Sequence, residues 1–312
     1  MENLLIGRKT RKHLALVGLP GSDMFALPTS NKEFQSGGHF GIEISSVNNL
    51  NILKKIVKLA DIEGITIDRI DECRGIMRLP DYEIREMVDI CAERQIGLVM
   101  AVGPRATYDC GGFSKTKNGA RIGYRLRGVE NIVKAIEDIK RALALGVYGF
   151  LIYDEGLLYS LNTLRYKGIL PEESVFKVSV HCGSSNPASC LLYEKIGADT
   201  INLVPDLEMS MLSATRATIT CPIDLFTDTA GDAGGLIRTY DVPEFIRVAS
   251  PVYLKCGPVS QKKQNHLPSD SELAERIKQT ALVVYTIKKY GPGFSQVNKK
   301  ERSLAVPVPV SE

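Results

Sequence analysis

The stretch FKVSVHCGSSNPASCLLYEKIGADTINLV, residues 176–204, contains one complete strand–helix–strand unit. A run rich in β-branched residues at 176–182 is followed by a polar loop, a segment of helical periodicity at 187–196 and a second such run at 200–204. Asn186 stands where a helix N-cap belongs, and Gly197 follows the helical segment, where a left-handed backbone is needed. This order predicts two parallel strands joined by a crossover helix.

The same unit recurs along most of the chain. Strand-like runs lie at 40–46, 66–73, 97–102, 149–154, 176–182, 200–204, 222–227 and 251–256. Helix-like segments lie at 49–60, 81–95, 129–145, 187–196, 207–217, 242–249 and 270–289, and Ser269 with Glu272 forms a capping box before the last. Eight alternating units predict an α/β protein with a closed (β/α)8, or TIM, barrel over residues 39–290.

An open doubly wound sheet is the alternative architecture for alternating strands and helices. It usually uses fewer strands and carries a glycine fingerprint after the first one, and no G-x-G-x-x-G is present. We therefore prefer the barrel and expect no NAD. Residues 1–38 form an N-terminal extension, with a strand at 14–18 or a barrel plug, and residues 291–312 are expected to be a flexible, frayed tail on a single domain.

Composition restricts the class of protein. The 312 residues are 44% hydrophobic and 24% charged, which is typical of a globular domain. The net charge of +3, from 39 Lys and Arg against 36 Asp and Glu, makes nucleic-acid binding unlikely on bulk electrostatics. Seven cysteines without a CxxC pair indicate reduced thiols, and no run approaches about 18 apolar residues. We expect a cytoplasmic protein with no membrane partner, and homo-oligomerisation is left open.

In a TIM barrel the chemistry lies where the strands end, because the following loops gather at that face. Alternation places Glu43, Asp71, His181 and Lys255 inward at the ends of the first, second, fifth and eighth strands. We take His181, Lys255 and Glu43 as candidate catalytic residues, with His181 as the proton-transfer group. Glu43, Asp71 and His181 are also candidate ligands for a divalent metal of unknown identity.

Other polar residues near the strand ends are candidate substrate-binding groups. Arg105 and Arg125 lie in a long loop at 103–128, Asn202 ends the sixth strand, and Arg238 follows a glycine-rich segment after the seventh. Guanidinium groups bind carboxylates and phosphates through paired hydrogen bonds, so a small anionic substrate is expected. The alternative is that the arginine-rich loop binds RNA or a protein partner.

The segment NPASCLLYEKIGADTINLVPDLEMSMLSATRATITCPID, residues 186–224, resembles the collagenase-like peptidases of family U32. The shared pattern is a helix ending in Gly-Ala before the sixth strand, an acidic residue opening the next helix, and a strand with an acidic end. The resemblance implies a barrel and a hydrolase acting on a peptide-like substrate. The family carries a cysteine-containing segment after the seventh strand, whereas residues 227–240 contain no cysteine, so no iron–sulfur cluster is expected.

Three functional hypotheses follow from these patterns. The first is a peptidase-like hydrolase that acts on a small anionic or peptide-like substrate at the C-terminal rim of the strands. The second is a lyase or aldolase that uses Lys255 as a Schiff-base amine, or a divalent metal, on an anionic metabolite. The third is a barrel without catalytic activity that binds RNA or protein.

Overall fold

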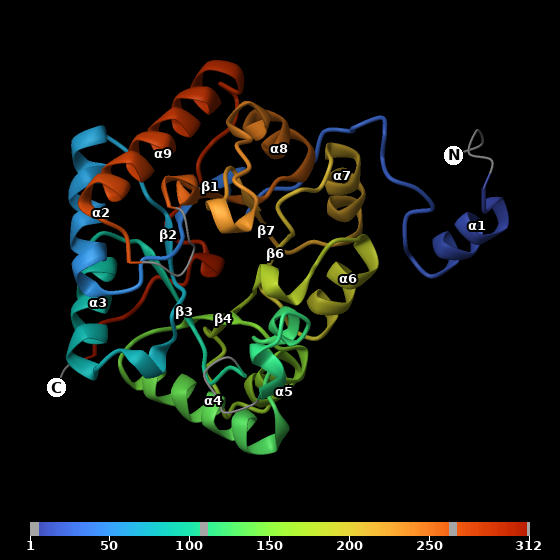
Figure 1. The fold of residues 1–312 in the computed structure, drawn as a ribbon. Coiled ribbons are helices and arrows are strands. Elements are labelled where there is room, and N and C mark those ends of the chain that lie inside the picture. Colours follow the sequence, from blue (N-terminus) through green and yellow to red (C-terminus); the bar gives the residue numbers. More distant parts are fainter. Residues whose placement is uncertain (1–5, 107–111, 262–266, 311–312) are drawn as a thin grey trace.

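Eight parallel strands form a closed barrel in which each strand pairs with the next and the eighth pairs with the first (Figure 1). The structure is a computed structural model that describes residues 6–106, 112–261 and 267–310. The strands are β1 (Phe40–Ile44), β2 (Arg69–Glu72), β3 (Gly97–Ala101), β4 (Gly149–Ile152), β5 (Val175–Val178), β6 (Thr200–Asn202), β7 (Ile223–Phe226) and β8 (Val252–Cys256). The prediction of a (β/α)8 barrel is confirmed.

A ring of helices surrounds the barrel (Figure 1). These helices are α2 (Leu50–Glu63), α3 (Asp81–Glu93), α4 (Gly128–Ala144), α5 (Glu155–Tyr166), α6 (Pro187–Lys195), α7 (Met209–Thr218), α8 (Val242–Ala249) and α9 (Asp270–Tyr290). The outward side chains of the strands, such as Ile42, Ile44 and Leu254, are buried beneath them. No helix in the described ranges is both long and apolar enough to cross a bilayer.

Local sequence signals set several of the helix ends. Asn186 caps α6 by accepting a hydrogen bond from the Ser189 amide, and Ser269 with Glu272 forms the expected capping box on α9. Gly197 has a φ of 110°, and a Cβ there would lie 2.1 Å from Cγ of Asn162. Only glycine therefore suits the turn between α6 and β6.

The N-terminal extension contains a helix instead of the expected strand at 14–18. Helix α1 (Arg8–Leu16) has no buried residue within its described length and lies away from the barrel (Figure 1). Its Arg, Lys, Leu and Ala residues favour helix over strand. The segment after it runs along α7 and α8, where the Met24 amide donates to the Ser210 carbonyl and the Ser30 amide to the Arg247 carbonyl.

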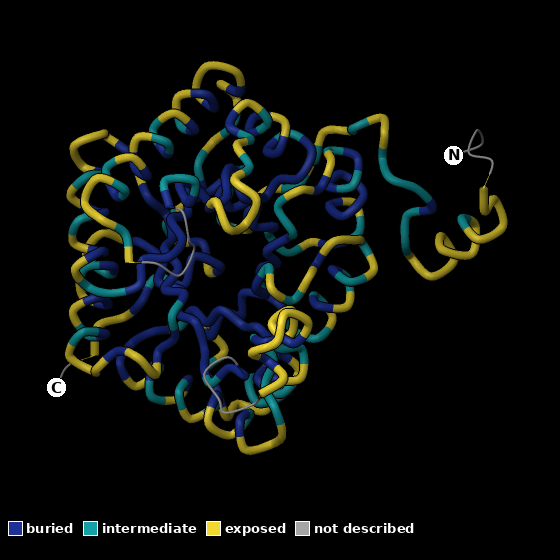
Figure 2. The backbone as a smooth tube through the Cα atoms, in the orientation of Figure 1, coloured by how far each residue is buried: buried dark blue, intermediate teal, exposed yellow. Residues whose placement is uncertain are grey.

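The C-terminal tail was expected to fray, and that expectation is wrong. Residues 296–305 close the N-terminal end of the barrel, where Val297 and Leu304 are buried. Figure 2 shows this buried interior surrounded by exposed helical faces. Gly97 and Gly149 bring no side chain to this end, so the Leu304 carbonyl packs against Gly97 and the Ala305 Cβ against Gly149. The Val-Pro alternation in the sequence gives no local sign of this non-local packing.

Candidate active site at the barrel mouth

Six charged side chains fill the centre of the barrel, and we call them the charge cluster. They come from five strands, and each is 3% exposed or less. The cluster consists of three cations and three carboxylates: Arg69, Lys177, Lys255, Glu43, Asp71 and Asp224. Burial of this many charges is unfavourable unless each is paired, so the contacts within the cluster decide its effect.

Two lysines form ion pairs with Glu43 and Asp71, the carboxylates that sequence reasoning selected. Nζ of Lys177 lies 2.6 Å from both Glu43 oxygens and 2.9 Å from Oδ2 of Asp71. Nζ of Lys255 lies 2.5 Å from Oδ2 of Asp71 and 2.9 Å from Oε1 of Glu43. Glu43, Asp71 and Lys255 are thus brought together as predicted, but as ion pairs.

Sequence reasoning did not select Arg69 or Lys177 as site residues. Nε of Arg69 lies 2.5 Å from Oε2 of Glu43, and its guanidinium also pairs with Asp224 and stacks 3.5 Å from the Tyr253 ring centre. Alternation could have found both residues, since Arg69 lies two before Asp71 on β2 and Lys177 points inward on β5.

The pairing fixes the protonation of Lys255 and Glu43. Burial alone would lower the pKa of Lys255, but Asp71 and Glu43 raise it well above its ordinary value. Burial would raise the pKa of Glu43, but Arg69, Lys177 and Lys255 hold it well below its ordinary range. At neutral pH Lys255 is therefore an ammonium ion, and Glu43 is a carboxylate.

A small polar cavity, the mouth pocket, lies above the charge cluster at the C-terminal ends of the strands. Its volume is about 20 Å³, which is enough for one small polar group, because a single water needs roughly 10–15 Å³. It is lined by Ser45, Cys73, Tyr124, Leu151, Tyr153, Ser179, Val180, His181, Asn202, Phe226 and Lys255. Asn202, a predicted substrate-binding residue, is 2% exposed, and its Oδ1 has no hydrogen-bond partner in the described part of the chain.

His181 reaches the mouth pocket by a different route from the one predicted. Strand β5 ends at Val178, and Val180–Cys182 forms a 3₁₀ turn in which the Ser179 hydroxyl accepts from the His181 amide. The imidazole stacks on Tyr124 with ring centres 3.9 Å apart, and His181 as a whole residue is exposed to solvent. Loss of water around the ring, followed by Arg105 and Lys255, lowers the pKa of His181 to about 4. The imidazole is therefore neutral at pH 7.

The three predicted arginines take different positions. Arg105 is buried beside the mouth, where its guanidinium donates to the Cys73 carbonyl at 2.8 Å and lies 4.5 Å from the Tyr153 ring centre. Arg125 pairs with Glu155 and donates to the Tyr153 carbonyl. Arg238 donates to Asp241 and to the carbonyls of residues 205 and 207, and it lines neither the mouth pocket nor the cavity beside it. None of the three lines the mouth pocket, but the positive charge of Arg105 is near enough to lower the pKa of His181.

The predicted metal ligands Glu43, Asp71 and His181 do not form one ligand set. Lysine ammonium groups hold the two carboxylates, and His181 lies on the wall of the mouth pocket. No group of three or more His, Cys, Asp or Glu side chains in the described ranges is arranged to hold a metal ion. Metal dependence stays a prediction that requires its own measurement.

A second cavity, the side pocket, adjoins the mouth pocket. Its volume is about 190 Å³, and it shares Val180, His181 and Phe226 with the mouth pocket. Its other lining residues are Pro205, Thr229, Ala230, Ala233 and Pro258, which follow β6, β7 and β8. Together the two pockets form a polar recess joined to a mainly apolar one, with His181 on the wall of both.

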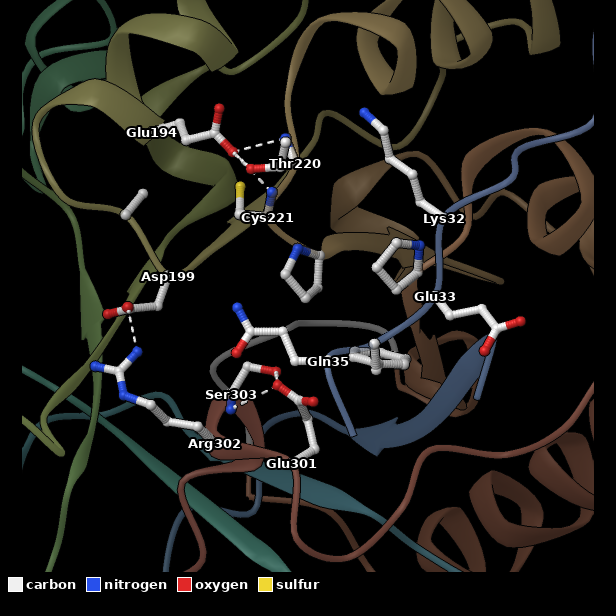
Figure 3. Close-up of a pocket in the computed structure, with 14 residues that line it drawn as sticks. Lys32, Glu33, Gln35, Glu194, Asp199, Thr220, Cys221, Glu301, Arg302 and Ser303 are labelled. Atoms are coloured by element: carbon white, nitrogen blue, oxygen red, sulfur yellow. Dashed lines mark hydrogen bonds and ion pairs between the residues drawn. The ribbon is translucent and has the colours of Figure 1, made fainter. Parts of the chain in front are cut away.

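A larger cavity of about 490 Å³ lies at the opposite, N-terminal end of the barrel (Figure 3). Its acidic groups already have partners: Glu194 accepts from Thr220, and Asp199 pairs with Arg302. In TIM barrels the N-terminal end usually contributes to stability, whereas the active site lies at the C-terminal ends of the strands. We therefore place the candidate active site at the mouth.

Known proteins of similar structure have low sequence identity to this chain. No family model and no curated protein matches the chain. Similar solved structures include a U32 peptidase, with 16% identity, a TM-score of 0.40 and coverage of 63% of this chain and 72% of that one. Native KDPGal has 9% identity and a TM-score of 0.48, and the match covers 82% of this chain and 98% of that one. A putative dihydrodipicolinate synthetase from Pseudomonas aeruginosa has 11% identity and a TM-score of 0.42, and the match covers 80% of this chain and 82% of that one. The function is therefore argued from the site.

Proposed function

We propose that this protein is an enzyme that hydrolyses an amide bond in a small anionic, peptide-like substrate at the barrel mouth. One observation carries the proposal: Lys255 and His181 line the same small polar cavity at the C-terminal ends of the strands. The Lys255 ammonium group can bind an anion, and the neutral imidazole of His181 beside it can accept a proton.

Each residue has a separate role in this proposal. An ammonium group has three hydrogens; Asp71 accepts one from Lys255 on the side of the barrel core, where Glu43 also forms an ion pair with Lys255. Lys255 can therefore also donate to an anion in the mouth pocket, and Arg105 adds positive potential beside it. His181 accepts a proton from the attacking water as the water oxygen bonds to the carbonyl carbon. The C–N bond then breaks, and the imidazolium returns the proton to the departing amine.

Binding of the anion assists this proton transfer. Arg105 and Lys255 are two of the causes that hold the pKa of His181 at about 4, and a bound carboxylate offsets their positive charge. The imidazole becomes a better base once the substrate is in place, because its conjugate acid is then less disfavoured.

The lyase hypothesis has less support from the geometry. A Schiff base requires Lys255 to lose a proton, and its two carboxylate partners oppose that loss. Borohydride treatment in the presence of pyruvate tests this directly. Covalent labelling of Lys255 would favour the lyase over the hydrolase.

The test of the proposal is amine release from N-acetylglycine and glycylglycine by the wild type and two variants. His181→Asn should lower kcat by about 100-fold or more, because proton transfer is lost. Lys255→Met should mainly raise KM through loss of the anion anchor. Lys54→Met, on the exposed face of α2, is the control and should behave as the wild type. Full activity in His181→Asn, or no amine release by the wild type, would refute the proposal.

Metal dependence is measured separately. A metal that binds the folded protein raises its melting midpoint, so melting is recorded with and without Mg²⁺, Mn²⁺ and Zn²⁺. A rise in the midpoint that is lost in His181→Asn would support the metal role predicted from the sequence for His181.

A further inference from the structure

The mouth pocket and the side pocket differ in size and in chemistry. The mouth pocket, at about 20 Å³, holds one small polar group beside Lys255. The side pocket, at about 190 Å³, is lined mainly by Pro205, Phe226, Ala230 and Pro258. A cavity of about 150 Å³ lined by apolar side chains is sufficient for a benzene molecule, so the side pocket suits one leucine or phenylalanine side chain.

The few polar groups that line the side pocket do not favour binding of a charged ligand. The Thr229 hydroxyl accepts a hydrogen bond from the Leu236 amide at 2.9 Å, so it already has a partner. His181, on the wall shared with the mouth pocket, is neutral at pH 7. An uncharged apolar group therefore fits this space better than a second anion.

Asn202 adds a third condition on the ligand, besides an anionic group beside Lys255 and an apolar group in the side pocket. Asn202 lines the mouth pocket, and its Oδ1, which is buried from solvent, has no hydrogen-bond partner among the described residues. A buried acceptor without a partner is unfavourable, so a ligand that brings an N–H to this position gains affinity. An amide N–H is the donor that a peptide-like substrate carries.

We infer that the substrate is an N-acyl amino acid, or the C-terminal residue of a peptide, that has an apolar side chain. This inference rests on the proposed function. The carboxylate lies in the mouth pocket on Lys255, the side chain lies in the side pocket, and the amide N–H donates to Asn202. The two pockets share Val180, His181 and Phe226, so their ligand groups are close neighbours. An α-carbon joins a carboxylate, a side chain and an amide nitrogen in this way.

The test compares the binding of three probes by calorimetry: N-acetylglycine, N-acetyl-leucine and N-acetyl-leucinamide. N-acetyl-leucine should bind the wild type about 10- to 100-fold more tightly than N-acetylglycine, since it buries a leucine side chain. N-acetyl-leucinamide, which lacks the carboxylate, should lose at least about 10-fold relative to N-acetyl-leucine. Asn202→Leu should weaken both N-acetyl acids by a similar factor.

Variants of the side pocket separate its contribution from that of the mouth. Ala230→Leu fills the pocket, and it should remove the preference for N-acetyl-leucine over N-acetylglycine. Because Ala230 is fully buried and the variant could misfold, Ala233→Phe adds bulk at an exposed lining position as a second test. Ile237→Phe places the same ring on the same loop outside the pocket, and it should keep the preference.

The outcomes distinguish this inference from the function on which it rests. Equal binding of N-acetylglycine and N-acetyl-leucine, both weakened by Lys255→Met, would overturn the side-chain assignment and support the anion site. A leucine preference that persists in Ala230→Leu and Ala233→Phe would also overturn the assignment. Binding of none of the probes, or binding that Lys255→Met does not weaken, would overturn both.

Discussion

Removal of the Lys177 ammonium tests whether charge balance holds the barrel centre together. The charge cluster has three cations and three carboxylates, so its net charge is zero, and Lys177→Met changes it to −1. The lost ammonium lies within 3.0 Å of all four oxygens of Glu43 and Asp71. Removing one partner of a buried ion pair costs about 3–5 kcal/mol, because an uncompensated charge stays buried. We expect a loss of unfolding free energy in this range.

A double variant separates charge from packing. Lys177→Met with Glu43→Gln restores a net charge of zero, with two cations and two carboxylates, and should recover part of the lost stability. The surface pair of Lys54 and Glu86, 2.8 Å apart with both side chains about half exposed, is the matched control. Lys54→Met should cost less than about 1 kcal/mol, because water screens exposed pairs.

The assay is urea unfolding followed by far-ultraviolet circular dichroism, since the chain has no tryptophan. Measurements at pH 7 and pH 5 give a second check. Loss of Lys177 raises the folded-state pKa of the remaining carboxylates, so the stability deficit of the variant should shrink as the pH falls. A single variant as stable as the wild type, or a double variant less stable than the single one, would refute the reasoning.

Three further predictions concern other parts of the molecule. Gly97→Ala should cost about 1–3 kcal/mol and expose the tail to proteolysis, because its Cβ would lie 1.9 Å from the Leu304 carbonyl oxygen; Gly293→Ala, with open space around it, should leave unfolding and proteolysis unchanged. Burial raises the pKa of Glu72 from 4.5 to about 7, so its stabilising effect is present below pH 4.5 and is lost as the pH rises through 7. Glu72→Gln should therefore gain about 3 kcal/mol over the wild type between pH 4.5 and pH 8 in urea unfolding, and a constant difference would contradict this. N-acetylglycine should raise the pKa of His181 from about 4 in an NMR titration and bind more tightly at pH 5 than at pH 8, whereas an unchanged titration would separate His181 from the anion site.

The sequence was sufficient to predict the barrel because the evidence for it is repeated and local. Each strand-like run contains the observed strand or most of it, and Asn186 and Ser269 cap helices where capping chemistry predicts. The tail could not be predicted in the same way. Its packing depends on the absence of side chains at Gly97 and Gly149, which lie far away in the sequence.

The candidate site was predictable in position but not in pairing. Alternation correctly directs Glu43, Asp71 and Lys255 into the barrel, but it cannot show which cation meets which carboxylate. For His181 the predicted position at the C-terminal end of the barrel is correct, but the alternation argument does not apply. The strand ends at Val178, and a 3₁₀ turn places the imidazole at the mouth.

The order of charges along the barrel axis explains how an anion could bind above three buried carboxylates. Asp224 accepts from Thr200 and pairs with Arg69, Glu43 contacts three cations, and Asp71 contacts two. Lys255, rather than a carboxylate, is the cluster member that lines the mouth pocket. An incoming carboxylate therefore meets a cation at the shortest distance, where attraction is strongest, while the compensated carboxylates lie behind it. The same arrangement that keeps Lys255 protonated makes it a poor nucleophile and a good anchor, and this leaves His181 as the group at the mouth that can move a proton at neutral pH.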